Sequence, residues 1–284
     1  MSKHIVAVSG GIDSMALLHM CRYQWFDDAQ YIIAHVNHGI RKDGSEDEAL
    51  VAQIAKDYGF TFVSTNLALP TNASEETARM ARYEWLLDIK KRYDAIAIIT
   101  AHHQDDVLET IVINCIRGTG WRGLLSLKSH VFLKRPLLSM SKVSLCEYAI
   151  SHSIQWREDS TNQDMSILRN NIRATVMRRI DTSERKKLVS IYQSQIDLDV
   201  DIQKEIDKLY SQSVDSDGLS RYRLIMYGPE VAYEIVSRWL DCSLTLAQRQ
   251  RLHRFIATAR PSSSIELGDG LTLAVTTRQL VVYH

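Results

Sequence analysis

The stretch AVSGGIDSMALLHM, residues 7 to 20, decides the fold because it joins a β-branched strand pattern to a helical pattern through two glycines. Consecutive glycines let backbone N–H groups turn toward an anion, and the positive end of the following helix adds to the attraction. Hydroxyl groups flank the pair, and Asp13 can face a magnesium ion that the anion carries. The stretch therefore predicts a phosphate site, and the alternative is a tight strand-to-helix turn without a ligand. Its residues are Ser9, Gly10, Gly11, Ile12, Asp13 and Ser14.

The spacing of this loop differs from that of two common nucleotide loops. A Walker loop places a lysine beside the terminal phosphates after a longer glycine-spaced stretch, and dinucleotide folds carry GxGxxG. A loop that holds the outer phosphates without that lysine fits a reaction in which pyrophosphate leaves and the α-phosphate is attacked.

Strand and helix patterns alternate around the loop. Strand-like runs cover His4–Val8, Tyr31–Val36, Thr61–Asn66 and Ala95–Thr100, and helical patterns cover Ser14–Tyr23, Ser45–Tyr58 and Ser74–Tyr93. This alternation predicts an α/β fold with a doubly wound parallel sheet. Ligands of such sheets bind beyond the carboxyl ends of the strands, where the loop lies.

The second half of the chain departs from this strand–helix alternation. A fifth strand at Val131–Lys134 and a helix at Lys142–Ser151 continue the first pattern, and after Arg173 the residues from Thr175 to Tyr210 predict long polar helices. A small α+β unit is expected at the end, with a helix at Ala247–Thr258, strands at Ser264–Leu267, Leu271–Val275 and Gln279–Tyr283, and a turn at Gly268-Asp269-Gly270. We expect two domains, residues 1–180 and 181–284.

Composition is that of a soluble globular chain with a substantial core. The 284 residues are 45% hydrophobic and 24% charged, and the apolar runs are strand-sized, so no membrane contact is predicted. No secretory leader pattern precedes the first apolar run. The cysteines are scattered without a CxxC pair, which argues against zinc or an iron–sulfur cluster and favours a reducing cytoplasm.

Charge is distributed unevenly along the chain. The formal net charge is zero, which argues mildly against nucleic-acid binding. Residues 1–116 carry 10 basic and 16 acidic side chains, residues 117–187 carry 14 and 6, and residues 188–284 carry 10 and 12, so the net charges are −6, +8 and −2. The basic middle segment is either a solvated face or a surface for phosphate backbones.

An ordered set of motifs identifies a family. SGGIDS resembles the pyrophosphate-binding PP-loop of the N-type ATP pyrophosphatases, which have a Rossmann-like sheet. The motifs that follow in order, through Arg173, resemble those of the tRNA(Ile)-lysidine synthases. They are HVNHGIR (residues 35–41), ARYEW (81–85), AHHQDDVLET (101–110), RGTGWRGLLSL (117–127), RPLL (135–138), REDSTN (157–162) and RNNIR (169–173). The remainder is similar only in outline, as a helical segment and a small C-terminal domain.

The resemblance implies an activity and its ligands. Such an enzyme uses ATP with magnesium to ligate free lysine onto the wobble cytidine of the CAU anticodon of isoleucine tRNA. The cytidine is first adenylated, pyrophosphate and AMP are released, and codon specificity changes from AUG to AUA. The C-terminal region would then bind tRNA. The sequence leaves open whether the chain forms a homodimer.

Acidic residues follow the fourth predicted strand. Taken alone, Asp105 and Asp106 are ordinary first-turn acids of a helix. Asp106 and Glu109 are also three residues apart on one helix face, so the pair could receive an ammonium group or a metal. The resemblance implies that they bind the substrate lysine.

Histidine and arginine side chains complete the predicted site. The pair His102 and His103 suggests zinc, but a third ligand at a familiar spacing is missing from the sequence around it. The resemblance instead places His102 beside the cytidine and the α-phosphate, as a hydrogen-bond donor. Arg82 would ordinarily be a solvated surface residue, whereas the resemblance implies that it holds the α-phosphate or the base.

The predicted set of residues therefore has two parts. The catalytic residues are Asp13, Arg82, His102, Asp106 and Glu109. Because the basic segment contains several motif positions, we favour RNA contact there over a solvated face. The predicted tRNA contacts are Arg117, Arg122, Arg169 and Arg173. The backbone after the second strand is expected to receive adenine, and the roles of His35, Asn37 and His38 stay open.

Two other functions fit parts of the sequence. A thiolase with the same loop would use paired cysteines, which this chain does not carry at a suitable spacing. A nucleotide-sensing module would not need the acid pair or the basic segment. Pyrophosphate release separates the sensor from the enzyme.

Overall fold

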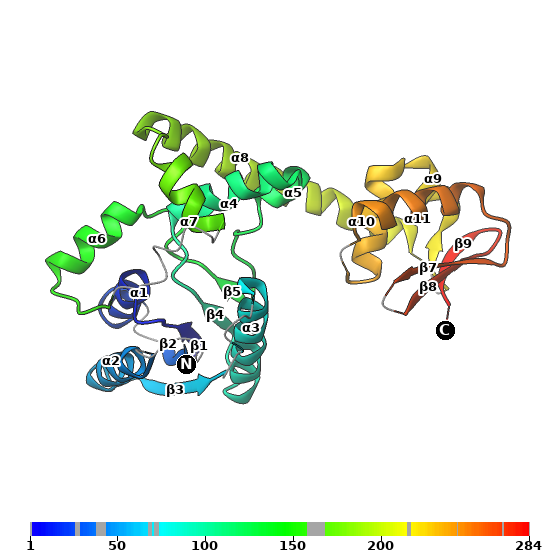
Figure 1. Ribbon diagram of the computed structural model, residues 1–284. Coiled ribbons are helices and arrows are strands. Elements are labelled where there is room, and N and C mark those ends of the chain that lie inside the picture. Colours follow the sequence, from blue (N-terminus) through cyan, green and yellow to red (C-terminus); the bar gives the residue numbers. More distant parts are fainter. Residues whose placement is uncertain are drawn as a thin grey trace. The chain divides into compact units, whose positions relative to one another are not determined.

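The computed structural model describes residues 2–25, 29–37, 44–67, 70, 74–157, 168–214, 217–242, 244–268 and 270–283. These divide into two compact units, Met1–Gln195 and Ile196–His284, which are described separately (Figure 1). Among the positions singled out in the sequence, His38 to Arg41, residues 158–162 and Asp269 lie outside the described part.

A parallel sheet forms the centre of the first unit, as the sequence predicts. Five strands lie in the order β3-β2-β1-β4-β5, and every pairing is parallel. Their bounds are Ser2–Ala7 (β1), Ala29–Asn37 (β2), Thr61–Asn66 (β3), Ala97–Ile99 (β4) and Leu133–Lys134 (β5). The chain winds outward from β1 to β3 and returns to the other side of β1 with β4. The order thus reverses between β1 and β4, and ligands of such sheets bind at this switch point.

Alternation along the strands directs side chains to two helical layers. On β1, Val6 packs with residues of α1 (Ile12–Tyr23), α2 (Gly44–Asp57) and α6 (Lys142–Ser151). Its neighbour Ile5 faces the other side and packs with Leu86 and Ile89 of α3 (Glu75–Arg92). Because successive strand residues point to opposite faces, each strand contributes to both layers. Figure 1 shows α1, α2 and α6 apart from α3 across the sheet.

The rest of the first unit is helical. It comprises α4 (Gln104–Arg117), α5 (Gly120–Leu124), α7 (Leu168–Ile172), the π-helical turn η2 (Arg173–Met177) and the start of α8 (Thr182–Ser213). Leu108 and Ile113 of α4 are buried with Ile172 and Met177, and Leu188 of α8 packs against this cluster. The first half of α8 therefore belongs to the core of the first unit.

An antiparallel sheet forms the second unit, in the order β6-β9-β8-β7. Its elements are β6 (Leu219–Ser220), α9 (Arg221–Met226), α10 (Pro229–Trp239), α11 (Leu246–Thr258), β7 (Ser263–Gly268), β8 (Leu271–Val275) and β9 (Gln279–Val282). Residues of the helices and the sheet share one buried core. The predicted small α+β unit is confirmed, whereas the sequence analysis did not predict α9 and α10. Ala232, Ile235 and Val236 lie at helical spacing in α10 and could have indicated it.

Several element boundaries differ from the prediction by a few residues, and for α1 and β5 the structure gives a local reason. Helix α1 begins at Ile12 rather than Ser14, because Gly11 is already its N-cap. Strand β5 is limited to Leu133–Lys134, because His130 and Leu133 close a tight turn by donating to each other's carbonyl groups. In the described part of the chain, every helix is too short or too polar to cross a bilayer.

Candidate active site

The glycine loop is organised by the two hydroxyl groups that flank it. Gly10 has a φ of +92°, a conformation that L side chains rarely adopt. The Ser14 hydroxyl donates to the carbonyl of Gly11 at 2.9 Å and accepts from the backbone N–H of Ser9 at 3.1 Å. The two hydroxyl oxygens also lie 3.1 Å apart. The loop is thus a preformed turn at the end of β1, which suits an anion.

Two residues outside the loop fasten it to the rest of the unit. Arg157 donates its backbone N–H to the carbonyl of Gly10 at 3.0 Å. Its guanidinium lies 2.8 Å from Asp47 and 2.5 Å from Glu46, both in the first turn of α2. His35, whose role the sequence left open, is buried, and its Nδ1 lies 2.9 Å from the carbonyl oxygen of Val8. Arg157 lies in a family motif, but its contact with Gly10 was not predicted.

Asp13 is paired with a lysine from a distant part of the chain. Lys142 Nζ lies 2.6 Å and 2.7 Å from the two carboxylate oxygens of Asp13. His103 Nε2 lies 3.6 Å from the same carboxylate. Burial by itself would raise the pKa of Asp13, but the His103 hydrogen bond and the charges of His103 and Lys142 lower the pKa below its ordinary value. Asp13 therefore stays ionised, with a cationic partner that the sequence did not indicate.

His103 holds three carboxylates around the start of α4. As the N-cap, its Nδ1 accepts from the backbone N–H of Asp105 at 3.2 Å, while Asp106 accepts from the His103 N–H at 2.9 Å. Its Nε2 lies 3.5 Å from Asp106. Burial opposes the charged imidazole, but the Asp13 hydrogen bond and the charges of Asp106 and Asp13 prevail and raise the pKa of His103. The side chain thus bridges Asp13 and Asp106.

His102 lies beside this cluster and is neutral. Its Nδ1 lies 2.8 Å from the Thr100 hydroxyl. Burial lowers the pKa of His102 to about 3, assisted by the charges of Arg135, Arg79 and Arg169 and opposed by Asp106. When Thr100 donates to Nδ1, Nε2 carries the proton and can donate a hydrogen bond to a phosphate oxygen.

The predicted acid pair occupies the first turns of α4, and the two members differ in access. The Asp106 side chain is 14% exposed and that of Glu109 is 2% exposed. Arg173 donates to both carboxylate oxygens of Glu109, at 2.7 Å and 3.0 Å. Arg169 Nε lies 3.5 Å from the same group, and its Nη2 donates to Thr110 at 2.9 Å. The structure thus joins Glu109 with two arginines that the sequence analysis assigned to tRNA.

The three other arginines of the predicted site, Arg82, Arg117 and Arg122, lie on three different helices. Arg82 is half-buried on α3, 5.7 Å from the centroid of the Tyr83 ring. Arg117 is exposed in the last turn of α4, at the opposite end of that helix from Asp106. Arg122 lies in α5 over the Trp121 ring, 4.4 Å from its centroid.

Part of the positive charge of residues 117–187 faces acids of the first 116 residues. The pairs are Lys142 with Asp13, Arg157 with Glu46 and Asp47, Arg173 with Glu109, and Arg185 with Asp105. Arg135 is buried and donates to the carbonyls of Leu127 and Lys128. The basic segment therefore neutralises some of these acids, whereas its Arg178, Arg179, Lys186 and Lys187 are exposed.

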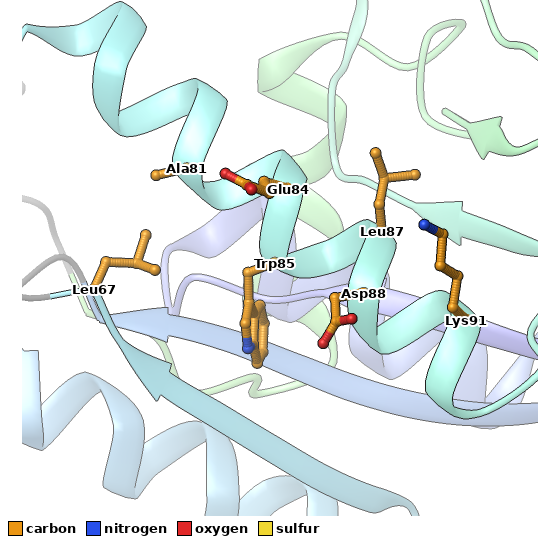
Figure 2. Close-up of a pocket in the computed structure, with 7 residues that line it drawn as sticks. All are labelled: Leu67, Ala81, Glu84, Trp85, Leu87, Asp88 and Lys91. Atoms are coloured by element: carbon orange, nitrogen blue, oxygen red, sulfur yellow. The ribbon is translucent and has the colours of Figure 1, made fainter.

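Two further features bear on ligands. Within the described ranges, we find no group of three or more His, Cys, Asp and Glu side chains placed to hold a metal ion. A groove of about 520 Å³ lies on α3 beside the end of β3 (Figure 2). It is lined by Leu67, Ala81, Glu84, Trp85, Leu87, Asp88 and Lys91, none of which is a predicted site residue. The convergent charges at the switch point, rather than this groove, mark the candidate active site.

Comparison with known proteins places these features in a family. A family model described as the PP-loop domain matches residues 1–180. A tRNA(Ile)-lysidine synthase of Clostridium tetani is 33% identical over 215 residues, which are 72% of this chain and 45% of the relative. One of Bacteroides thetaiotaomicron is 32% identical over 228 residues, 76% of this chain and 53% of the relative. The chain spans about half the length of the curated relatives it matches.

A solved structure shares the fold. The U34-tRNA thiolase NcsA from Methanococcus maripaludis with its [4Fe-4S] cluster superposes with a TM-score of 0.55. The sequence identity is 18%, and the match covers 69% of this chain and 73% of that one. At this identity the likeness concerns the arrangement of strands and helices alone.

Proposed function

The chain belongs to the PP-loop family, and from this premise we propose that it ligates free lysine onto the wobble cytidine of an isoleucine tRNA with a CAU anticodon. ATP activates the cytidine, AMP and pyrophosphate are released, and the codon read changes from AUG to AUA. The observation that carries the proposal is the cluster of Asp13, His103, Asp106 and Glu109 beside the PP-loop. The names of the matched relatives support it.

The first step is adenylation of the cytidine. The carbonyl oxygen of cytosine attacks the α-phosphorus of ATP, and the bond to the β-phosphate breaks as pyrophosphate leaves. The backbone of Gly10 and Gly11 and the hydroxyls of Ser9 and Ser14 hold the pyrophosphate. We assign to His102 a hydrogen bond to an α-phosphate oxygen and to Arg82 the charge that stabilises this group.

The second step uses the acid pair. The lysine ammonium binds at Asp106 and Glu109 and gives a proton to the Asp106 carboxylate, and its ε-nitrogen attacks the activated ring carbon. The carbon–oxygen bond breaks and AMP leaves with that oxygen. Asp106 is the more accessible member, and an ammonium reaches Glu109 only by replacing Arg173. Holding the three reactants together supplies much of the rate.

Magnesium is expected near Asp13, whose carboxylate would hold the ion together with the phosphates of ATP once Lys142 has moved. Carboxylate and phosphate oxygens are the ligands that Mg²⁺ prefers. Both Asp13 oxygens already contact Lys142, so Asp13 would reach a metal only after Lys142 moved. We assign no step to the metal.

ATP chemistry and tRNA binding are assigned to different predicted domains. We assign the ATP chemistry to residues 1–180, which the PP-loop domain matches, and tRNA binding to residues 181–284. Arg117, Arg122, Arg169 and Arg173 remain the proposed tRNA contacts on the first domain.

One assay tests this function. The full chain is incubated with ATP, labelled lysine and an isoleucine tRNA carrying a CAU anticodon, with a GAU-anticodon version as the matched control. We expect label in the CAU tRNA alone, together with pyrophosphate release. Pyrophosphate release without labelled RNA would indicate a different PP-loop enzyme, and binding of ATP without any release would indicate a sensor.

A further inference from the structure

Lys142, the first residue of α6, has no role in the mechanism above although its ammonium lies beside the PP-loop. We propose that Lys142 binds the β- and γ-phosphates of ATP, moving from Asp13 to the phosphates when the nucleotide binds. This inference rests on the proposed use of ATP. It supplies from another helix the phosphate-binding lysine that the SGGIDS loop lacks.

The placement of Lys142 suits this task. Asp13 is the second residue of α1, two positions after the glycine pair, and Lys142 reaches it from 129 residues further along the chain. The backbone at Lys142 is anchored, because its N–H donates to Asp105 at 2.8 Å. The segment from Lys142 to Arg157 therefore contacts the loop region at both ends, through Asp13 and through Gly10.

The Lys142 side chain can move while its backbone stays in place. It is 40% exposed, and its four-carbon stem carries a point charge with rotatable donors. When it leaves, Asp13 keeps a partner, because His103 Nε2 lies 3.6 Å from the carboxylate. The Asp13 carboxylate is therefore not left without a partner when Lys142 moves to the phosphates.

The negative charge at the loop favours a cationic side chain such as that of Lys142. A triphosphate entering beside Gly10 meets the carboxylate of Asp13, which lies near the same imidazole of His103 as Asp105 and Asp106. Like charges a few ångströms apart repel each other at a protein surface, where the effective dielectric constant is well below that of water. A cation that neutralises Asp13 and then contacts the phosphates removes this penalty.

The alternative is that Lys142 only neutralises Asp13. The two roles differ in what they do to nucleotides of different length, because AMP lacks the β- and γ-phosphates. We compare dissociation constants for ATP and AMP by calorimetry on the full chain, using Lys142→Met and Lys142→Arg. Lys56→Met, on the exposed side of α2, is the matched control for loss of one lysine charge.

Lys142→Met should weaken ATP binding by roughly ten- to hundred-fold, the effect of one charge-assisted hydrogen bond, and AMP binding by less than about two-fold. Lys142→Arg should lose less than Lys142→Met, and Lys56→Met should bind both nucleotides as the unaltered chain does. Equal losses for ATP and AMP, or no loss for ATP, would overturn the proposal. A full chain that binds no ATP would overturn the proposed function as well.

A double variant separates neutralisation from phosphate binding. Asp13→Asn removes the charge that Lys142 neutralises, so Lys142→Met in that background should cost nothing if neutralisation is its only role. We expect the double variant to bind ATP roughly ten-fold more weakly than Asp13→Asn alone. If circular dichroism shows that Lys142→Met by itself does not fold, the double variant replaces it in the test. The double variant leaves no unpaired carboxylate at position 13. Equal ATP binding by the double variant and Asp13→Asn would contradict the proposal.

Discussion

Two carboxylates of the candidate site already have cationic partners, so substrates bind there by exchange. Asp13 contacts Lys142, and Glu109 contacts Arg173 through both oxygens. A ligand cation at Glu109 therefore gains only the difference between its own interaction and the one it displaces. Removing either carboxylate affects the ligand and the resident cation together.

Glu109→Gln should raise the lysine concentration needed for half-maximal rate by up to roughly ten-fold, because displacing Arg173 offsets part of the gain, and leave the ATP requirement nearly unchanged. The reason is that its carboxylate is assigned to the substrate ammonium. Steady-state titrations of both substrates measure the effect, with Glu84→Gln on exposed α3 surface as the control. Pyrophosphate release without lysine should persist. Equal damage to both requirements would indicate a structural or metal-binding role.

The effect of His103 on stability should depend on pH. The pKa of His103 in the folded protein lies above its ordinary value of 6.5, with burial opposing and the hydrogen bond to Asp13 and the charges of Asp106 and Asp13 favouring the charged form. Its contribution is therefore complete below about 6.5 and is lost as pH rises through the raised pKa. His103→Asn keeps an N-cap side chain and should destabilise the protein more at pH 6 than at pH 9. Urea unfolding at the two pH values checks this, and an equal cost at both would refute it.

At the scale of elements, the PP-loop is a turn that three other segments hold in place. Ser14 of α1 bonds inside the loop, Arg157 after α6 bonds Gly10 and α2, and His35 on β2 contacts the carbonyl of Val8. The backbone of the loop is therefore held in its turn before a phosphate binds. Its shape depends on the positive φ of Gly10.

Gly10→Ala should reduce both stability and ATP affinity, whereas Gly59→Ala should reduce stability alone. Both glycines have positive φ, +92° and +74°, so either alanine costs about 1–2 kcal/mol of folding free energy. Only Gly10 lies in the loop, where a Cβ would also come 3.4 Å from Asp47. We expect ATP affinity to fall roughly ten-fold or more for Gly10→Ala. Chemical unfolding and ATP titration report the two effects, and similar ATP binding by both variants would show that the loop geometry is not needed.

Over the whole molecule, the first compact unit extends beyond the span matched by the PP-loop domain. The match ends at residue 180, whereas the unit ends at Gln195 within α8. The intervening residues include Arg185, which lies 2.5 Å from Asp105, and Leu188, which packs on the α4 cluster. Tyr192 is buried as well.

A chain ending at Gln195 should therefore bind ATP with the affinity of the full chain, and one ending at Glu184 should be less stable by about 3 kcal/mol. The shorter fragment loses the partner of Asp105 and part of the apolar contact on α4. Both should bind tRNA more weakly. Urea unfolding, ATP titration and filter binding of tRNA measure these outcomes, and equal stability of the two fragments would show that the start of α8 adds nothing to the first unit.

Local sequence predicted most of the elements of this protein and its loop, whereas α9 and α10 were missed. Apolar periodicity predicted the parallel sheet and α6 at Lys142–Ser151, because burial on one or both faces imposes a repeat that is read within a few residues. The glycine pair indicated an anion site, because positive φ is a local requirement. The acid pair on α4 was likewise visible from its spacing.

The pairing of charges is decided only by the tertiary structure. Lys142 and Asp13 are 129 residues apart, and Arg173 and Glu109 are 64 apart. Periodicity tells which side chains are polar and on which face of an element they lie, but many arginines and lysines of the basic segment satisfy it equally. Which cation meets which carboxylate depends on how the carboxyl ends of β1 and β4 and the starts of α4 and α6 are brought together, because an ion pair forms only over a few ångströms.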